Sequence, residues 1–188
     1  MSDSVIRPVY PWPAARQAAV AALKEQGLAV ISVEVAASDA RDTARQMIRR
    51  AVSETLASTY GYPQEQLRLL SAPGQPVRVN IPGHHLNLSL SHEPGLSLAV
   101  IGDGGAVGVD LMRIDEELDW EPVAQLYLGP ELSAAIGRRP QSQQAYSFAQ
   151  AWTEQEARLK CRGLSITEWS PELAHLLAQC RLAPLDLP

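Results

Sequence analysis

The feature that most constrains the fold is a long stretch, residues 141–162, that contains neither glycine nor proline. Most of its residues are good helix formers, so the stretch predicts one long helix. Phe148, Trp152 and Glu156 recur every four residues and therefore share one face of that helix. A carboxylate on an apolar face is costly to bury unless a cation or hydrogen bonds compensate its charge. Glu156 is thus a candidate functional residue, and Lys160 lies one turn further on.

A simpler interpretation of Glu156 and Lys160 is an ion pair on a solvated helix face, which is the commoner situation for two such residues four positions apart. The two aromatic residues on the same face, Phe148 and Trp152, favour the functional interpretation. Both aromatic side chains are themselves expected to belong to the core rather than to a binding site.

Length and composition limit the class of protein. The chain has 188 residues, of which 46% are hydrophobic and 20% charged, as in soluble globular proteins of one domain or two small halves. Residues 1–13 lack the basic start and apolar run of a signal peptide, and nothing is long and apolar enough to span a membrane. We therefore expect a cytoplasmic protein without a membrane partner. The net charge of −5 argues against broad binding of nucleic acid.

The order of apolar patterns, capping residues and turn residues predicts an α+β chain. Two cysteines, Cys161 and Cys180, are expected to be free thiols, and no zinc-ligand spacing surrounds them. The expected helices are 14–26, 39–59, 123–128, 130–136, 141–162 and 171–179, and the expected strands are 28–35, 86–91, 96–101, 106–111 and the start of one at 181–187.

Two predicted strands carry polar residues that point to chemistry. Residues 86–91 alternate leucine with Asn or Ser, and this pattern brings Ser91 and His92 to the end of a half-buried strand. Asp110 lies in the predicted strand 106–111 beside small residues, which leave room next to its carboxylate. Taken alone, Asp110 could simply cap a strand end. Taken with Glu156, it suggests an oxygen-ligand site for a hard cation, Mg²⁺ or Mn²⁺.

A row of arginines lies on the first long helix. Arg41, Arg45 and Arg49 are spaced by four residues and share one face. This row is either a solvated basic stripe or part of an anion site, and the spacing alone leaves both interpretations open.

Several segments together resemble the 4′-phosphopantetheinyl transferases. The strongest are GVDLMRI at 108–114 and AWTEQEARLK at 151–160. In the same order, PGQP at 73–76, LNLSLSH at 86–92 and YLGPE at 127–131 resemble further segments of that family. The larger, surfactin-synthetase-activating type is more similar than the compact holo-acyl-carrier-protein synthases.

The resemblance implies a fold of two similar α/β halves, a pseudo-dimer with antiparallel sheets, a long helix in each half and the active site between them. We expect residues 1–102 to contribute to coenzyme A binding. Residues 103–188 would carry the metal and catalytic residues, and this half could lack the family's final strand. Because both halves lie in one chain, a monomer is expected.

The implied activity is transfer of 4′-phosphopantetheine from coenzyme A to a serine of an apo acyl, polyketide or peptidyl carrier protein, with Mg²⁺ as cofactor. Asp110 and Glu156 would be the metal ligands, and Glu156 or a metal-bound water would take the serine proton. Lys160 would act in catalysis and bind the phosphates. The remaining positions that match coenzyme A contacts are Arg45, Gly74, Gln75, Pro76, Ser91 and His92.

Two positions depart from the family pattern. Met112 lies where many larger members have a third carboxylate, and Gln155 replaces a lysine before the signature glutamate. These departures motivate a rival hypothesis, a catalytically inactive homologue that binds coenzyme A or a carrier protein. A third hypothesis is a metal-dependent phosphohydrolase built on the same carboxylate pair. Metal-dependent cleavage of simple phosphoesters would distinguish it from the other two.

Overall fold

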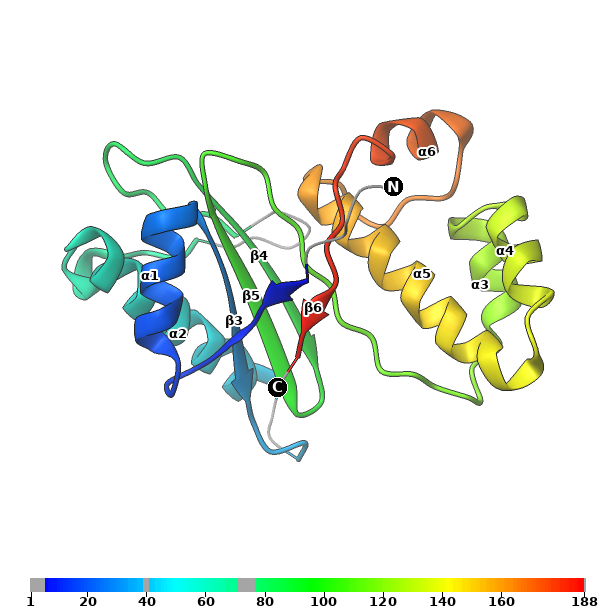
Figure 1. The fold of residues 1–188 in the computed structure, drawn as a ribbon, viewed down its shortest axis with the longest axis horizontal. Coiled ribbons are helices and arrows are strands. Elements are labelled where there is room, and N and C mark those ends of the chain that lie inside the picture. Colours follow the sequence, from blue (N-terminus) through cyan, green and yellow to red (C-terminus); the bar gives the residue numbers. More distant parts are fainter. Residues whose placement is uncertain (1–5, 39–40, 71–76, 188) are drawn as a thin grey trace.

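The computed structural model describes residues 6–38, 41–70 and 77–187. Helices and short strands follow one another in an α+β arrangement, which confirms the predicted fold class (Figure 1). In chain order the elements are β1 (Arg7–Pro8), β2 (Tyr10–Pro11), α1 (Arg16–Gln26), β3 (Leu28–Glu34), α2 (Arg41–Tyr60), the 3-10 helix η1 (Gln64–Gln66), β4 (Leu86–Glu93), β5 (Leu96–Asp103), α3 (Trp120–Tyr127), α4 (Pro130–Gly137), α5 (Gln141–Cys161), α6 (Pro171–Leu177) and β6 (Leu185–Asp186).

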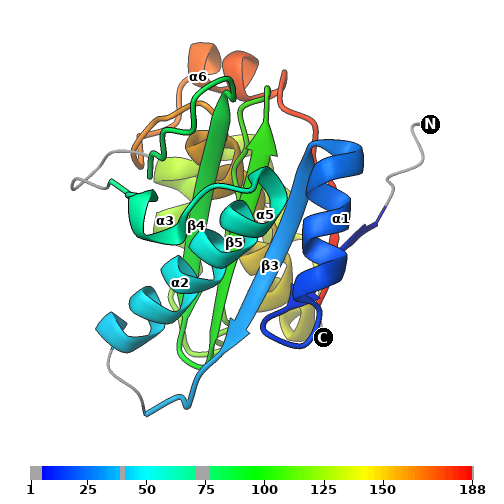
Figure 2. The ribbon, with the colours of Figure 1, turned by 90° about the vertical axis from the view of Figure 1, so that its left-hand side faces the viewer.

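A four-stranded sheet forms the centre of the first half. Its strand order is β2-β3-β5-β4, with β5 antiparallel to both of its neighbours. Helices α1 and α2 cover one face of this sheet (Figure 2). Alternate residues of the strands point into that layer, where Ile31 and Ile101 pack with Ile48 and Leu56 of α2. All four side chains are buried, so this layer is the main core.

The opposite face of the sheet is covered by an extended segment, residues 106–111. Val109 packs with Val30, Leu98 and Val100 of the sheet. The prediction of a strand at 106–111 is wrong, because this segment is not assigned to either sheet. It crosses the face of β4 instead of pairing with a strand edge, and serine side chains of β4 satisfy two of its backbone N–H groups.

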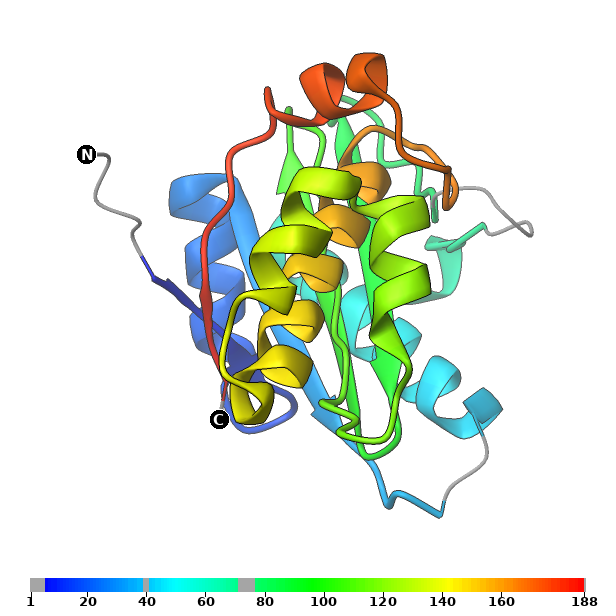
Figure 3. The same cartoon turned by 90° about the vertical axis from the view of Figure 1, so that its right-hand side faces the viewer.

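The second half is helical. Figure 3 shows α3 and α4 beside the long helix α5, with α6 at one end. Ala124, Leu128 and Ile136 pack against Phe148 of α5 and form a separate small core. Within the described part of the chain this half has no sheet of its own, and β6 pairs in parallel with β1. The two long helices, α2 and α5, agree with the expectation of one in each half. Two similar halves are not confirmed.

Gly108 lets the extended segment lie directly against α5. A Cβ atom at this position would overlap the carbonyl oxygen of Ala157 and lie 2.6 Å from the backbone nitrogen of Cys161. Only a residue without a side chain fits so close to a helix backbone. This approach brings Asp110, two residues later, next to the last turns of α5.

No described helix is both long and apolar enough to cross a membrane.

Candidate functional site

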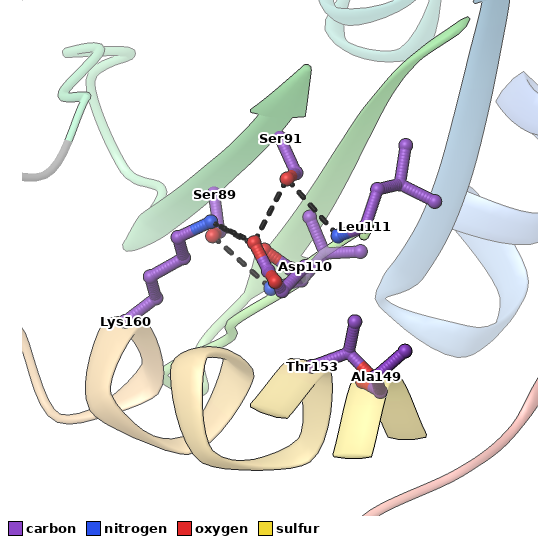
Figure 4. A network of polar contacts seen from close by, with 8 residues as sticks. Ser89, Ser91, Asp110, Leu111, Ala149, Thr153 and Lys160 are labelled. Carbon is purple, nitrogen blue, oxygen red and sulfur yellow. Dashed lines mark hydrogen bonds and ion pairs between the residues drawn. The ribbon is translucent and has the colours of Figure 1, made fainter. Parts of the chain in front are cut away.

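Asp110 lies at the centre of the site, between strand β4 and helix α5. Its Oδ1 atom accepts hydrogen bonds from Ser91 Oγ at 2.9 Å and from Lys160 Nζ at 2.6 Å (Figure 4). The Asp110 side chain is only 8% exposed, whereas that of Lys160 is 28% exposed. A nearly buried carboxylate is therefore compensated by one cation and one hydroxyl group.

Neighbouring bonds fix the backbone around Asp110. Lys160 Nζ also donates to the carbonyl oxygen of Val109 at 3.2 Å. The hydroxyl of Ser89 accepts from the Val109 N–H, and that of Ser91 accepts from the Leu111 N–H, each at 3.1 Å. Since Ser89 and Ser91 alternate with leucines along β4, both hydroxyls point to the same face of the sheet. The serines thus hold the segment on either side of Asp110.

Glu156 lies one turn before Lys160 on α5 and is partly buried. Burial raises the pKa of the Glu156 carboxyl, and the negative charge of Asp110 raises it further, while Lys160 acts in the opposite direction. The carboxylates of Asp110 and Glu156 line the same cavity. A carboxylate with a raised pKa is a better proton acceptor than an ordinary glutamate.

A cavity of about 390 Å³ joins these groups. It is mostly polar, and its wall includes Met112 at the position where a third carboxylate is common in the resembling family. Five of the residues expected at the site line this one cavity: Ser91, His92, Asp110, Glu156 and Lys160.

A second cavity of about 550 Å³ adjoins the first. The two share four lining residues, including Glu156 and Lys160. Val77, Leu164 and Ile166 give the second cavity a mainly apolar wall. Glu156 and Lys160 therefore lie between a polar space and an apolar groove, an arrangement suited to a ligand with a charged end and a less polar arm.

Positive charge gathers around His92. Burial lowers the pKa of His92 to about 4, and the charges of Arg45, Arg41, Lys160 and Arg49 add to this effect. The imidazole is consequently neutral at pH 7, with Nδ1 2.8 Å from the hydroxyl oxygen of Ser97.

One member of the arginine row of α2 reaches the cavity, whereas Arg49 donates to the carbonyl oxygen of Leu69 at 3.3 Å. Arg41 lines the cavity directly, a contribution that sequence reasoning did not separate from the rest of the row. Arg45 is half-exposed and forms an ion pair with Asp42 at 3.4 Å. The i, i+4 spacing of the arginines was the signal that could have identified Arg41.

Gln155 does not line the cavity, and three expected coenzyme A contacts fall in a part of the chain that the structure does not describe. Gly74, Gln75 and Pro76, expected near an adenine, lie outside the described residues. Gln155 donates instead to the carbonyl oxygen of Tyr127 at 3.3 Å and so links α5 to the end of α3.

The carboxylates provide a limited donor set for a metal. Among residues 6–38, 41–70 and 77–187, no cluster of three or more His, Cys, Asp or Glu side chains could hold an ion. Mg²⁺, however, commonly binds through one or two carboxylates and completes its shell with water and substrate phosphates. Asp110 and Glu156 fit a site of that kind, in which the substrate supplies further oxygens.

The fold and the site together define an α+β protein with a carboxylate pair and a lysine facing a cavity whose wall also contains Arg41 and Glu93. Residues 106–178 match the family model described as the 4′-phosphopantetheinyl transferase superfamily. The matched segment includes Asp110, Glu156 and Lys160. Members of this family use coenzyme A and act on carrier proteins. No curated protein matches the chain.

Proposed function

We propose that this protein transfers 4′-phosphopantetheine from coenzyme A to a serine of an apo acyl, polyketide or peptidyl carrier protein. The observation that carries the proposal is the meeting of Asp110, Glu156 and Lys160 in one cavity. These three residues lie inside the segment that matches the superfamily model. A carboxylate pair beside a lysine is the equipment expected for chemistry at a diphosphate.

Local positive charge supports recognition of the phosphates of coenzyme A. Three carboxylates, Glu93, Asp110 and Glu156, line the cavity together with Arg41 and Lys160. The charges of Arg45 and Arg49 also act on His92. Arg45, Ser91 and His92 would hold the 3′-phosphate, and Lys160 would contact the diphosphate as a point charge. An anion beside His92 would favour its protonated form, so the imidazole could become a second donor on binding.

Mg²⁺ is the proposed cofactor, held by Asp110 and Glu156 together with oxygens of the substrate. When bound, such an ion neutralises charge on the diphosphate oxygens. Mn²⁺ has similar ligand preferences and could replace it.

The proposed reaction is substitution at the β-phosphorus. The carrier serine oxygen forms a bond to that phosphorus, and the bond from phosphorus to the bridging oxygen breaks. The products are the holo carrier protein and adenosine 3′,5′-bisphosphate. Glu156 would accept the serine proton, and Lys160 would stabilise charge that develops on the phosphate oxygens.

The larger, surfactin-synthetase-activating type fits this chain better than the compact type. One chain supplies both Arg41 and Ser91 from the first half and Glu156 and Lys160 from α5. A site that one chain completes is compatible with a monomer, which we propose as the functional unit. The division into residues 1–102 and 103–188 remains part of this proposal.

The test is intact-mass analysis of apo carrier proteins incubated with this protein, coenzyme A and Mg²⁺. Fatty-acid, polyketide and peptide-type carriers are compared, each with an EDTA control. A metal-dependent gain of one phosphopantetheine supports the proposal. Binding of coenzyme A without any mass gain would instead support the inactive binding homologue. Cleavage of simple phosphoesters without a carrier would support the phosphohydrolase.

A further inference from the structure

The ammonium group of Lys160 is paired with the Asp110 carboxylate, which is also a proposed metal ligand. Lys160 Nζ lies 2.6 Å from Oδ1 of Asp110, and Ser91 Oγ donates to that same atom at 2.9 Å. Two donors therefore already act on Oδ1, and one of them carries a full positive charge. A divalent cation held by the Asp110 carboxylate would be repelled by this ammonium group.

We propose that Lys160 and a divalent cation compete for Asp110, and that the diphosphate of the substrate decides the competition by drawing the ammonium group away. The inference rests on the proposed function for the identity of the substrate. Lys160 would then have two alternative partners, Asp110 or the phosphates, and metal and coenzyme A would bind cooperatively.

The burial of the two side chains supports such an exchange. Asp110 is 8% exposed, so its negative charge requires a nearby cation, whether lysine or metal. Lys160 is 28% exposed and carries its charge on a flexible four-carbon stem. The aspartate is thus the fixed partner and the lysine the movable one. Lys160 also lines both cavities, so its ammonium group can turn toward a ligand without leaving the site.

Thermodynamic linkage gives this arrangement a measurable consequence. If coenzyme A removes the ammonium group from Asp110, it strengthens metal binding, and the metal must strengthen coenzyme A binding by the same factor. Typical coupling between two ligands lies between about 5-fold and 150-fold. Without the charge of residue 160, metal binding should become tighter in the substrate-free protein, and the coupling should fall.

The experiment is a calorimetric titration of Mn²⁺ into wild-type protein and into Lys160→Met, each with and without coenzyme A. The substitution keeps a long side chain and removes the charge. Arg158→Met is the matched control, because it removes one positive charge from the same helix at a residue paired with Glu154 at 3.9 Å. Thermal unfolding of each variant establishes that it is folded, and Lys160→Arg provides a charged second variant.

We expect Lys160→Met to bind Mn²⁺ about 5-fold or more tightly than wild type without coenzyme A, and Arg158→Met and Lys160→Arg to stay close to wild type. Equal Mn²⁺ affinity in Lys160→Met and wild type would overturn the inference, even if the wild type transfers phosphopantetheine. Tighter binding in Lys160→Met, with no transfer by the wild type to any carrier, would support the competition at Asp110 and reject the proposed function.

Discussion

Ser89 and Ser91, two residues apart on β4, differ in one contact. Each hydroxyl accepts a backbone N–H of the segment 106–111 at 3.1 Å, and both residues are buried. Only Ser91 also donates to Asp110. Substitution of Ser89 removes only a backbone contact, whereas substitution of Ser91 removes a backbone contact and the hydrogen bond to Asp110. Ser89 therefore provides the control for Ser91.

Ser91→Ala should lower the rate of phosphopantetheine transfer by about 10- to 150-fold, since a hydrogen bond to a charged group contributes about 1.5–3 kcal/mol. Ser89→Ala should lower the free energy of unfolding by about 1.5–3 kcal/mol. It should leave the transfer rate within about twofold of wild type, because Asp110 keeps both of its donors. Steady-state kinetics and urea unfolding of both variants measure this difference. Equal losses of rate in the two variants would show that the contact to Asp110 has no separate effect.

His92 should make the stability of the folded protein depend on pH. Its pKa falls from the ordinary 6.5 to about 4 in the folded state, chiefly through burial and then through Arg45. Between these two values the unfolded chain binds a proton that the folded protein does not. The free energy of unfolding should therefore decrease as the pH falls from 6.5 to about 4. The stability that the neutral His92 contributes is fully present above pH 6.5.

Replacement of His92 by Gln removes this titrating group. The loss of unfolding free energy between about pH 7 and about pH 5 should be smaller in His92→Gln than in wild type. Urea unfolding at both pH values gives the comparison, and His175→Gln, at an exposed position of α6, controls for the loss of one imidazole. The same pH dependence in His92→Gln and wild type would contradict the lowered pKa.

At the scale of elements, the contact between the segment 106–111 and helix α5 holds the site together. Gly108 permits this contact, because any Cβ there would overlap the backbone of α5 at Ala157. Gly105 lies just before this segment and offers a control, since a Cβ at that position meets no atom within 4 Å.

Gly108→Ala should decrease the free energy of unfolding by about 1–3 kcal/mol or more, because the segment and α5 must move apart to accept the methyl group. Gly105→Ala should change it by only about 0.5 kcal/mol. The same displacement would separate Asp110 from Lys160, so Gly108→Ala should also lose transfer activity. Unfolding curves and the mass assay test both effects, and wild-type stability in Gly108→Ala would refute the close packing.

The elements show what sequence patterns can and cannot predict here. Helical spacing predicted α5 and a common face for Glu156 and Lys160, because such periodicity is local. The segment 106–111 has the alternating side-chain pattern of a strand. Two of its N–H groups, however, donate to serine hydroxyls of β4. Only the tertiary structure decides between a strand partner and side-chain acceptors, so the error could not be seen in the sequence.

At the scale of the whole molecule, the sheet half and the helical half contribute different parts of one cavity. Ser91 and His92 come from β4 and Arg41 from α2, whereas Glu156 and Lys160 come from α5. The motifs and the family resemblance led us to expect an active site between the two halves. The helices of the second half were expected, but a sheet was expected beside them, and the described part of that half has none of its own. Short apolar runs do not reveal whether such a sheet assembles. The roles of the site residues stay predictions.

The most direct test of the account compares Glu156→Gln with Glu154→Gln in the carrier-protein mass assay with coenzyme A and Mg²⁺. Glu154 lies on the same helix and is 41% exposed, so its substitution makes the same chemical change away from the cavity. We predict near wild-type transfer by Glu154→Gln and a loss of about 100-fold or more by Glu156→Gln, because a positioned proton acceptor contributes about 10²–10⁴-fold. Equal transfer by the two variants would contradict a catalytic role for the carboxylate pair.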